Sequence, residues 1–149
     1  MRRSLATAGF MLLALLAAPL QAQDLAESGR DRFAEKCLMC HGLVSEDPGG
    51  FSWDNLRRPV IMTPIGPNLT QVFGRPAGTF EGYSYSKAFL AAAPTIVWDE
   101  AALDRWITDS QAMIRGSSMF LKVPDAGVRA GIIAYLKRYA PYPGYDCKC

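Results

Sequence analysis

The pentapeptide Cys37-Leu38-Met39-Cys40-His41 carries the strongest chemical signal in this 149-residue chain. Two thiols separated by two residues at a helical turn can each form a thioether with one vinyl group of a haem. The residue that follows then lies beneath the iron, where an imidazole offers a nitrogen lone pair. The pattern Cys-x-x-Cys-His is typical of covalent haem attachment. We therefore expect Cys37 and Cys40 to hold one haem c and His41, the only histidine, to ligate its iron.

Other chemistries also use closely spaced cysteines. A thioredoxin-like dithiol would follow a strand in a βαβ unit, and no such unit is visible in the sequence. A zinc site could combine Cys37, Cys40 and His41 with Cys147 or Cys149, but structural zinc sites usually pair two knuckle-like halves, and a single residue separates the last two cysteines. A simple disulfide is the third alternative, and the haem motif is favoured over all three.

Residues 1–22 have the features of a secretory signal. Arg2 and Arg3 form a positive start, the segment 5–20 is apolar and uncharged, and Ala22 offers the small residue that a signal peptidase prefers. The apolar segment is shorter than the roughly 20 residues that span a bilayer, which favours a cleaved signal over a retained anchor. We expect cleavage after Ala22 and export to the bacterial periplasm, where haem is attached to such motifs.

Composition and charge limit the remaining functions. The whole chain has 16 Lys plus Arg and 14 Asp plus Glu, so loss of Arg2 and Arg3 leaves 14 of each sign. A formally neutral chain without a basic stripe gives no reason to expect a nucleic-acid partner. No second apolar stretch is long enough to span a membrane. We expect one domain over residues 23–140, followed by a tail over 141–149 that contains Cys147 and Cys149.

The pattern of apolar residues and helix caps predicts an all-α fold. The sequence contains little of the alternation that would indicate strands. Such short helices would bury a thin core, and a large apolar cofactor would supply the rest. The expected helices are residues 25–40 capped by Asp24, residues 83–92, residues 100–113 capped by Asp99, and residues 125–139, with a long loop over residues 42–66.

A second axial ligand must come from elsewhere in the chain, and without another histidine a methionine thioether is the natural candidate. Met62, Met113 and Met119 remain once the signal is removed and Met39 is assigned to the attachment motif. Met119 follows the irregular segment Gly116-Ser117-Ser118, whose backbone freedom allows a side chain to turn toward a metal. We expect Met119 as the ligand, with Met62 or an open position as the alternatives.

These motifs together resemble the class I cytochrome c family over nearly all of residues 24–139. Gly29 and Phe33 match the family's first helix, where they would pack against Ile132 and Tyr135 of the last helix. The resemblance implies a small helical cytochrome c-like fold wrapped around one covalently bound haem. It also implies an electron-transfer protein rather than an enzyme.

The same resemblance assigns further site residues. Gly66-Pro67-Asn68-Leu69 matches the segment whose proline carbonyl accepts the N–H of the iron-bound histidine, so Pro67 would fix the tautomer of His41. Arg75 and Tyr85, and further along the chain Trp98, correspond to residues that contact a haem propionate. Trp106 would line the methionine side of the pocket.

The chain departs from the family pattern in several places. Arg115 replaces the usual proline before the ligand loop, which makes the loop less rigid. The exposed lysines that ring the haem edge in mitochondrial members are missing, since Gln111, Ala112 and Ser118 stand at the matching positions. The segment after His41 is longer than in the family, and the tail has no counterpart.

We therefore expect a periplasmic single-electron carrier that shuttles electrons between a donor dehydrogenase or respiratory complex and an acceptor such as an oxidase. The alternative is a dedicated haem subunit bound to a periplasmic oxidoreductase. Formal neutrality and the long loop favour that alternative somewhat, because a diffusing carrier gains from a charged docking face.

Overall fold

The computed structural model describes residues 24–41, 65–141 and 143–144. Within these ranges the structure is helical and has no strand, only isolated bridges between Phe73 and Pro141 and between Pro76 and Val97. The predicted all-α fold is therefore confirmed for this part of the chain. The predicted signal, all but the last two residues of the long loop, and both tail cysteines lie outside the described residues.

Backbone hydrogen bonds connect the first helix to the haem motif, but a turn at Cys37 interrupts the helical backbone. Residues 24–36 are helical, Cys37 is a turn, and α2 follows as Leu38–His41. The Cys37 N–H donates to the Phe33 carbonyl at 2.8 Å, and the Cys40 N–H donates back to the Cys37 carbonyl at 3.1 Å. This last bond spans three residues and tightens the turn, so the prediction of one unbroken helix was wrong at Cys37.

The other elements are α3 (Lys87–Ala92), the short 3-10 helix η1 (Ala93–Thr95), α4 (Glu100–Thr108), α5 (Ser110–Met113) and α6 (Ala126–Tyr139). Each of these four α-helices is preceded by a residue whose side chain accepts a hydrogen bond from the backbone N–H three residues further on. The accepting residues are Ser86, Asp99, Asp109 and Asp125. These caps satisfy N–H groups that have no partner within the helix. The predicted cap at Asp99 is confirmed, whereas Asp24 is itself helical and is not a cap.

Two predicted helix boundaries were wrong because of such caps. The expected helix over residues 100–113 is interrupted at Asp109, which has an extended backbone (φ −162°, ψ 100°) and caps α5 with its side chain. The expected helix over residues 83–92 begins only at Lys87, because the Ser86 side chain caps it there. A side chain that accepts a backbone N–H can thus end one helix and begin another, even where the spacing of apolar residues is continuous.

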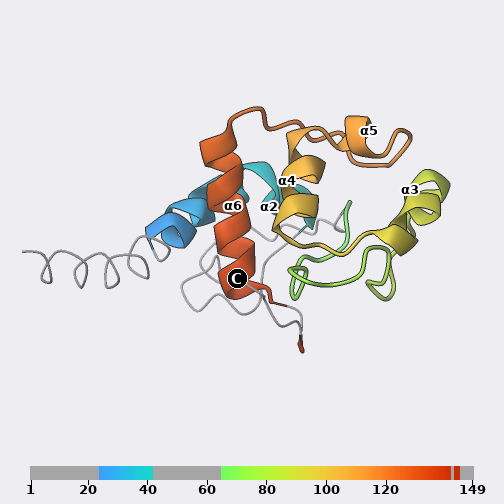
Figure 1. The fold of residues 1–149 in the computed structure, drawn as a ribbon, viewed down its shortest axis with the longest axis horizontal. Coiled ribbons are helices and arrows are strands. Elements are labelled where there is room, and N and C mark those ends of the chain that lie inside the picture. Colours follow the sequence, from blue (N-terminus) through green and yellow to red (C-terminus); the bar gives the residue numbers. More distant parts are fainter. Residues whose placement is uncertain (1–23, 42–64, 142, 145–149) are drawn as a thin grey trace, which may run out of the picture.

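The helix over residues 24–36 crosses α6 at very close range (Figure 1). A Cβ atom added to Gly29 would lie 1.9 Å from the Gly131 carbonyl oxygen, so the two backbones touch. Beside this contact the rings of Phe33 and Tyr135 pack with centroids 4.9 Å apart. The predicted packing of Gly29 and Phe33 on the last helix is confirmed, and it fixes the end of the first helix, where the cysteines lie.

Helix α4 packs against α6 and completes the frame around the interior. Its apolar side chains Leu103, Trp106 and Ile107 are all buried, as the sequence pattern predicts. An ion pair between Arg129 of α6 and Asp104 of α4, 2.7 Å apart, joins the two helices at the surface. None of the helices that the structure describes combines the length and apolar character needed to cross a membrane.

Substitution of Gly29 by alanine should destabilise the fold strongly. The added methyl group meets backbone rather than a flexible side chain, so the two helices must separate. We expect the free energy of unfolding to fall by at least about 2 kcal/mol, as overpacking usually does. Urea unfolding of the purified protein, followed by circular dichroism, measures the change.

Gly127→Ala is the matched control, because that glycine is exposed in α6 and its added Cβ would meet only the Asp125 side chain, at 3.3 Å. It should change the free energy of unfolding by no more than about 1 kcal/mol. Equal effects of the two substitutions would contradict the backbone contact.

Candidate functional site

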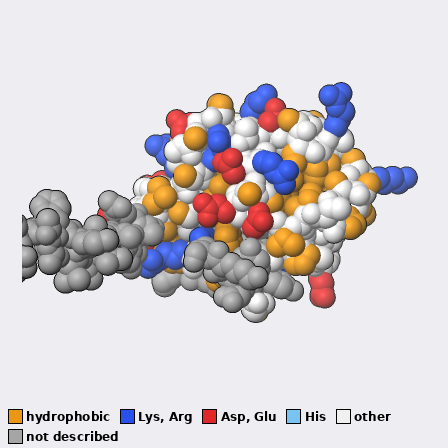
Figure 2. Space-filling view, viewed as in Figure 1, with side chains coloured by type: hydrophobic (Ala, Val, Ile, Leu, Met, Phe, Trp, Pro, Cys, Tyr) orange, Lys and Arg blue, Asp and Glu red, His pale blue; other side chains and the backbone are white. Residues whose placement is uncertain are grey.

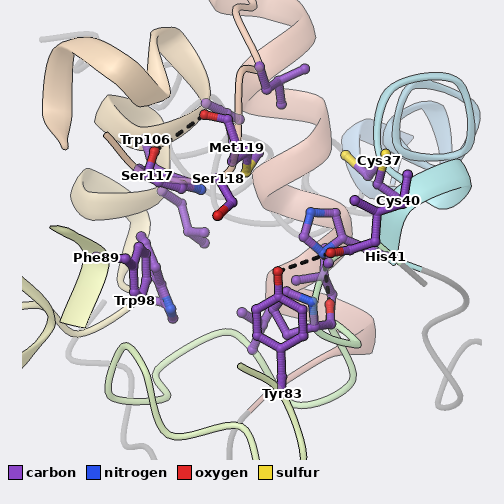
Figure 3. Close-up of a pocket in the computed structure, with 18 of the residues that line it drawn as sticks. Cys37, Cys40, His41, Tyr83, Phe89, Trp98, Trp106, Ser117, Ser118 and Met119 are labelled. Atoms are coloured by element: carbon purple, nitrogen blue, oxygen red, sulfur yellow. Dashed lines mark hydrogen bonds between the residues drawn. The ribbon is translucent and has the colours of Figure 1, made fainter. Parts of the chain in front are cut away.

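The helices enclose one large, mostly apolar cavity of about 430 Å³ (Figure 3). Its walls come from nearly every described element, and aromatic side chains contribute much of the surface. Cys37, Cys40 and His41 border one side, and Met119 lies on the opposite side with Ser117, Ser118 and Trp106. A cavity of this size and character is typical of a site for a small molecule or cofactor.

The two cysteines of the motif are free thiols in this structure. Cys37 is buried, and burial, with a smaller effect from Cys40, raises the pKa of the Cys37 thiol to about 12. Cys37 lines the cavity from the turn that follows residues 24–36, and Cys40 lines it from α2. Two thiols on a tight turn at the wall of an apolar cavity suit thioether attachment to a haem edge.

His41 ends α2 and is held in one orientation. Its Nδ1 atom lies 2.7 Å from the Pro67 carbonyl oxygen, and because a carbonyl only accepts, Nδ1 must carry the proton. Burial lowers the pKa of His41, and the bond to Pro67 partly opposes that effect. The ring is therefore neutral near pH 7 and its other nitrogen, Nε2, keeps a free lone pair for a metal.

Gly66 makes this arrangement of the histidine possible. A Cβ at this position would lie 2.5 Å from Cε1 and 2.7 Å from Nδ1 of His41. The Gly66 N–H also donates to the Cys40 carbonyl at 2.8 Å, which ties the segment to the motif. The segment Gly66-Pro67 thus packs against the imidazole of His41, whose other edge faces the cavity.

Across the cavity, Met119 is half-buried and is the only methionine of the described residues that lines the wall. Met113 packs on the core from the end of α5 without reaching the cavity, and Met39 is 73% exposed. Met62 lies outside the described residues. A neutral imidazole on one wall and a thioether on the other could together supply the two protein ligands of a haem iron.

The three residues expected at a propionate also meet at this cavity. Arg75, Tyr85 and Trp98 all line it, and Arg75 is only 7% exposed. The Arg75 guanidinium donates to the carbonyl oxygens of Thr70 at 3.0 Å and Asn68 at 3.4 Å. Burial raises the pKa of Tyr85, so that its phenol stays neutral. A buried cation beside a phenol provides charge and hydrogen bonding for an anionic group.

Sequence reasoning missed several residues of the site. Phe89 lies between Tyr85, Trp98 and Trp106, with ring centroids 5.0, 6.2 and 5.6 Å away. Its position four residues after Tyr85 in an expected helix was an available signal. Tyr83 also lines the cavity, and its hydroxyl donates to the Ile65 carbonyl at 3.0 Å. No local pattern pointed to that contact, because the two residues are far apart in the sequence.

Comparison with known proteins gives a consistent result, although no family model matches the chain. Cytochrome c2 of Blastochloris viridis is 36% identical over 132 residues, which cover 88% of this chain and 90% of that protein. Cytochrome c of Chlamydomonas reinhardtii is 38% identical over 120 residues, 78% of this chain and 90% of the relative. Cytochrome c of Sesamum indicum is 36% identical, with 74% and 86% covered.

Identity at this level over nine-tenths of a relative shows common family membership rather than a shared local motif. The cytochromes c are electron-transfer proteins, not enzymes, and they carry one covalently bound haem c. The helical fold and the apolar cavity between the described helices agree with that cofactor. This chain therefore belongs to the class I cytochrome c family and is an electron-transfer protein with one haem c.

Proposed function

We propose that this protein carries single electrons in the bacterial periplasm, with Cys37 and Cys40 attached to the haem and His41 and Met119 as the axial ligands. The observation that carries the proposal is the position of two thiols and an imidazole on one wall of the cavity and a thioether on the other. If His41 and Met119 both bind the iron, no coordination position would remain for oxygen or peroxide, and electron transfer is the chemistry that the haem would supply.

When bound, the haem supplies an iron that alternates between the ferric and ferrous states. The chain's own residues set the balance between those states. Met119 contributes a neutral ligand, and the apolar walls disfavour the additional charge of ferric iron, so both raise the reduction potential. The Pro67 carbonyl, 2.7 Å from Nδ1, fixes the tautomer of His41 and makes its Nε2 a better donor.

We assign Arg75, Tyr85 and Trp98 to a propionate of the haem. Burying a carboxylate is costly unless a charge or hydrogen-bond donors compensate. The buried Arg75 guanidinium is held by carbonyls of residues 68 and 70, so it needs little rearrangement to meet an anion.

For location and partners, we propose that residues 1–22 are a cleaved signal, that residues 23–140 form the haem domain, and that residues 141–149 are a separate tail. The redox partners would be a dehydrogenase or cytochrome complex as donor and an oxidase as acceptor. A dedicated subunit bound to one oxidoreductase is the second candidate. On the face displayed in Figure 2, acidic and basic side chains are interspersed.

Met119→Ala should abolish the weak near-infrared absorption that iron–thioether ligation gives to the oxidised protein. Loss of the sulfur also opens an axial position, so the variant should bind added imidazole or cyanide readily. Absorption spectra of the purified ferric protein measure both effects. Met62→Ala and Met113→Leu are the controls and should keep the band. Loss of the band in Met62→Ala alone would reassign the ligand.

Electron transfer should depend only weakly on ionic strength, because the chain after cleavage has 14 side chains of each sign. Two oxidants of opposite charge are suitable reagents for the ferrous protein: the hexacyanoferrate(III) anion and the tris(phenanthroline)cobalt(III) cation. We expect each rate to change by less than about threefold between low and physiological salt. Steep changes of opposite sign for the two reagents would reveal a charged face at the haem edge instead.

A further inference from the structure

The segment that carries Met119 lacks regular structure and lacks the proline that usually stiffens it. It leaves α5 at Ile114, passes Arg115 and Gly116, and reaches α6 only at Ala126. Gly116 has a φ of +85°, which turns the chain back toward α5. Such a segment needs side-chain contacts to hold one conformation, since its backbone has few bonds of its own.

The Gln111 side chain supplies most of these contacts. The two N–H groups of its Nε2 atom point to the Met119 carbonyl, 2.6 Å away, and to the Ser117 carbonyl and hydroxyl oxygens, each 2.9 Å away, so that two of these acceptors share one hydrogen. Its Oε1 atom accepts the Gly116 N–H at 3.1 Å. The partners fix the orientation of the amide, because a carbonyl only accepts and a backbone N–H only donates. One side chain therefore joins both ends of Gly116–Met119.

The preceding residue, Ser110, contacts the same segment from the protein interior. Ser110 is fully buried, and its Oγ donates to the Met119 carbonyl at 2.8 Å and more weakly to the Leu121 carbonyl at 3.2 Å. Its backbone N–H also donates to the Leu121 carbonyl at 3.1 Å. The Met119 carbonyl thus receives its two shortest hydrogen bonds from two consecutive residues at the start of α5, and the Ser117 hydroxyl lies farther from it, at 3.3 Å.

We propose that Gln111 is a positioning residue that holds Met119 in place for the haem iron, with Ser110 as its buried partner. Fixing the Met119 carbonyl fixes its Cα, and with it the direction in which the thioether enters the cavity. Gln111 thereby replaces, with hydrogen bonds, the stiffness that a proline at position 115 would give. The inference rests on the proposed role of Met119 as a ligand, and it adds a residue that lies outside the cavity wall.

The test measures how easily an added ligand displaces the thioether. Imidazole is titrated into the ferric haem protein, and the midpoint is the concentration at which half of the near-infrared absorption is lost. Gln111→Ala should lower this midpoint roughly tenfold, the factor that corresponds to about 1.4 kcal/mol and that the loss of one or two hydrogen bonds accounts for. Gln111→Glu keeps an acceptor for the Gly116 N–H but loses both donors, and should shift the midpoint in the same direction.

Lys122→Ala is the matched control, because it removes an exposed ion pair with Asp109, 2.7 Å apart, at the start of the same helix. Lys122 makes no described contact with residues 116–119, so its imidazole midpoint should stay within about twofold of the unmodified protein. Urea unfolding of all variants separates a local effect from a global one. The inference requires that Gln111→Ala lower the imidazole midpoint by a larger factor than the change in the free energy of unfolding of this variant would account for.

The outcomes distinguish this inference from the ligand assignment beneath it. If Met119→Ala abolishes the near-infrared band while Gln111→Ala and Gln111→Glu leave the imidazole midpoint unchanged, Met119 is the ligand and the positioning role of Gln111 is wrong. An equal shift in Lys122→Ala would also overturn that role. If Met119→Ala keeps the band, the ligand assignment itself fails, and the role of Gln111 fails with it.

Discussion

The contact between the Gly29 backbone and the Gly131 carbonyl oxygen determines where the haem motif lies. Only glycine allows the helix over residues 24–36 to approach α6 this closely, since any side chain at Gly29 would meet backbone. The packing of Phe33 on Tyr135 then fixes the rotation of the first helix. Cys37, one helical turn after Phe33, faces the interior as a result. The position of the proposed attachment site thus follows from backbone contact between two helices distant in sequence.

The remainder of the site surrounds that anchored motif, and each wall has a different physical task. The segment Gly66-Pro67 orients the imidazole of His41 through one hydrogen bond of 2.7 Å. The rings of Tyr85, Phe89, Trp98 and Trp106 make one wall of the cavity apolar. The start of α5 holds Met119 through its carbonyl. If His41 and Met119 bind the iron as proposed, two neutral ligands, the apolar walls and the buried Arg75 would tune a redox centre and leave no open position for catalysis.

Local signals in the sequence predicted the elements whose causes are local. The cap at Asp99 and the last helix, predicted over residues 125–139, depend on residues close together in the sequence, and both agree with the structure. The interruption at Asp109 was missed because an aspartate inside an apolar pattern is usually solvent-facing. Pro67 and Arg75 could be named only through resemblance to a family. The hydrogen bonds of Gln111 depend on a loop folding back, and no pattern along the chain encodes that.

Intact-mass spectrometry of the denatured protein shows whether Cys37 and Cys40 bind the haem covalently. Covalent attachment predicts the mass of residues 23–149 plus one haem, retained after extraction with acidified acetone. It also predicts loss of covalent haem from a variant with Cys37→Ala and Cys40→Ala, whereas Cys147→Ala with Cys149→Ala keeps it. A haem that is extracted from the unmodified protein, or that remains covalently bound without Cys37 and Cys40, would rule out attachment at these two cysteines.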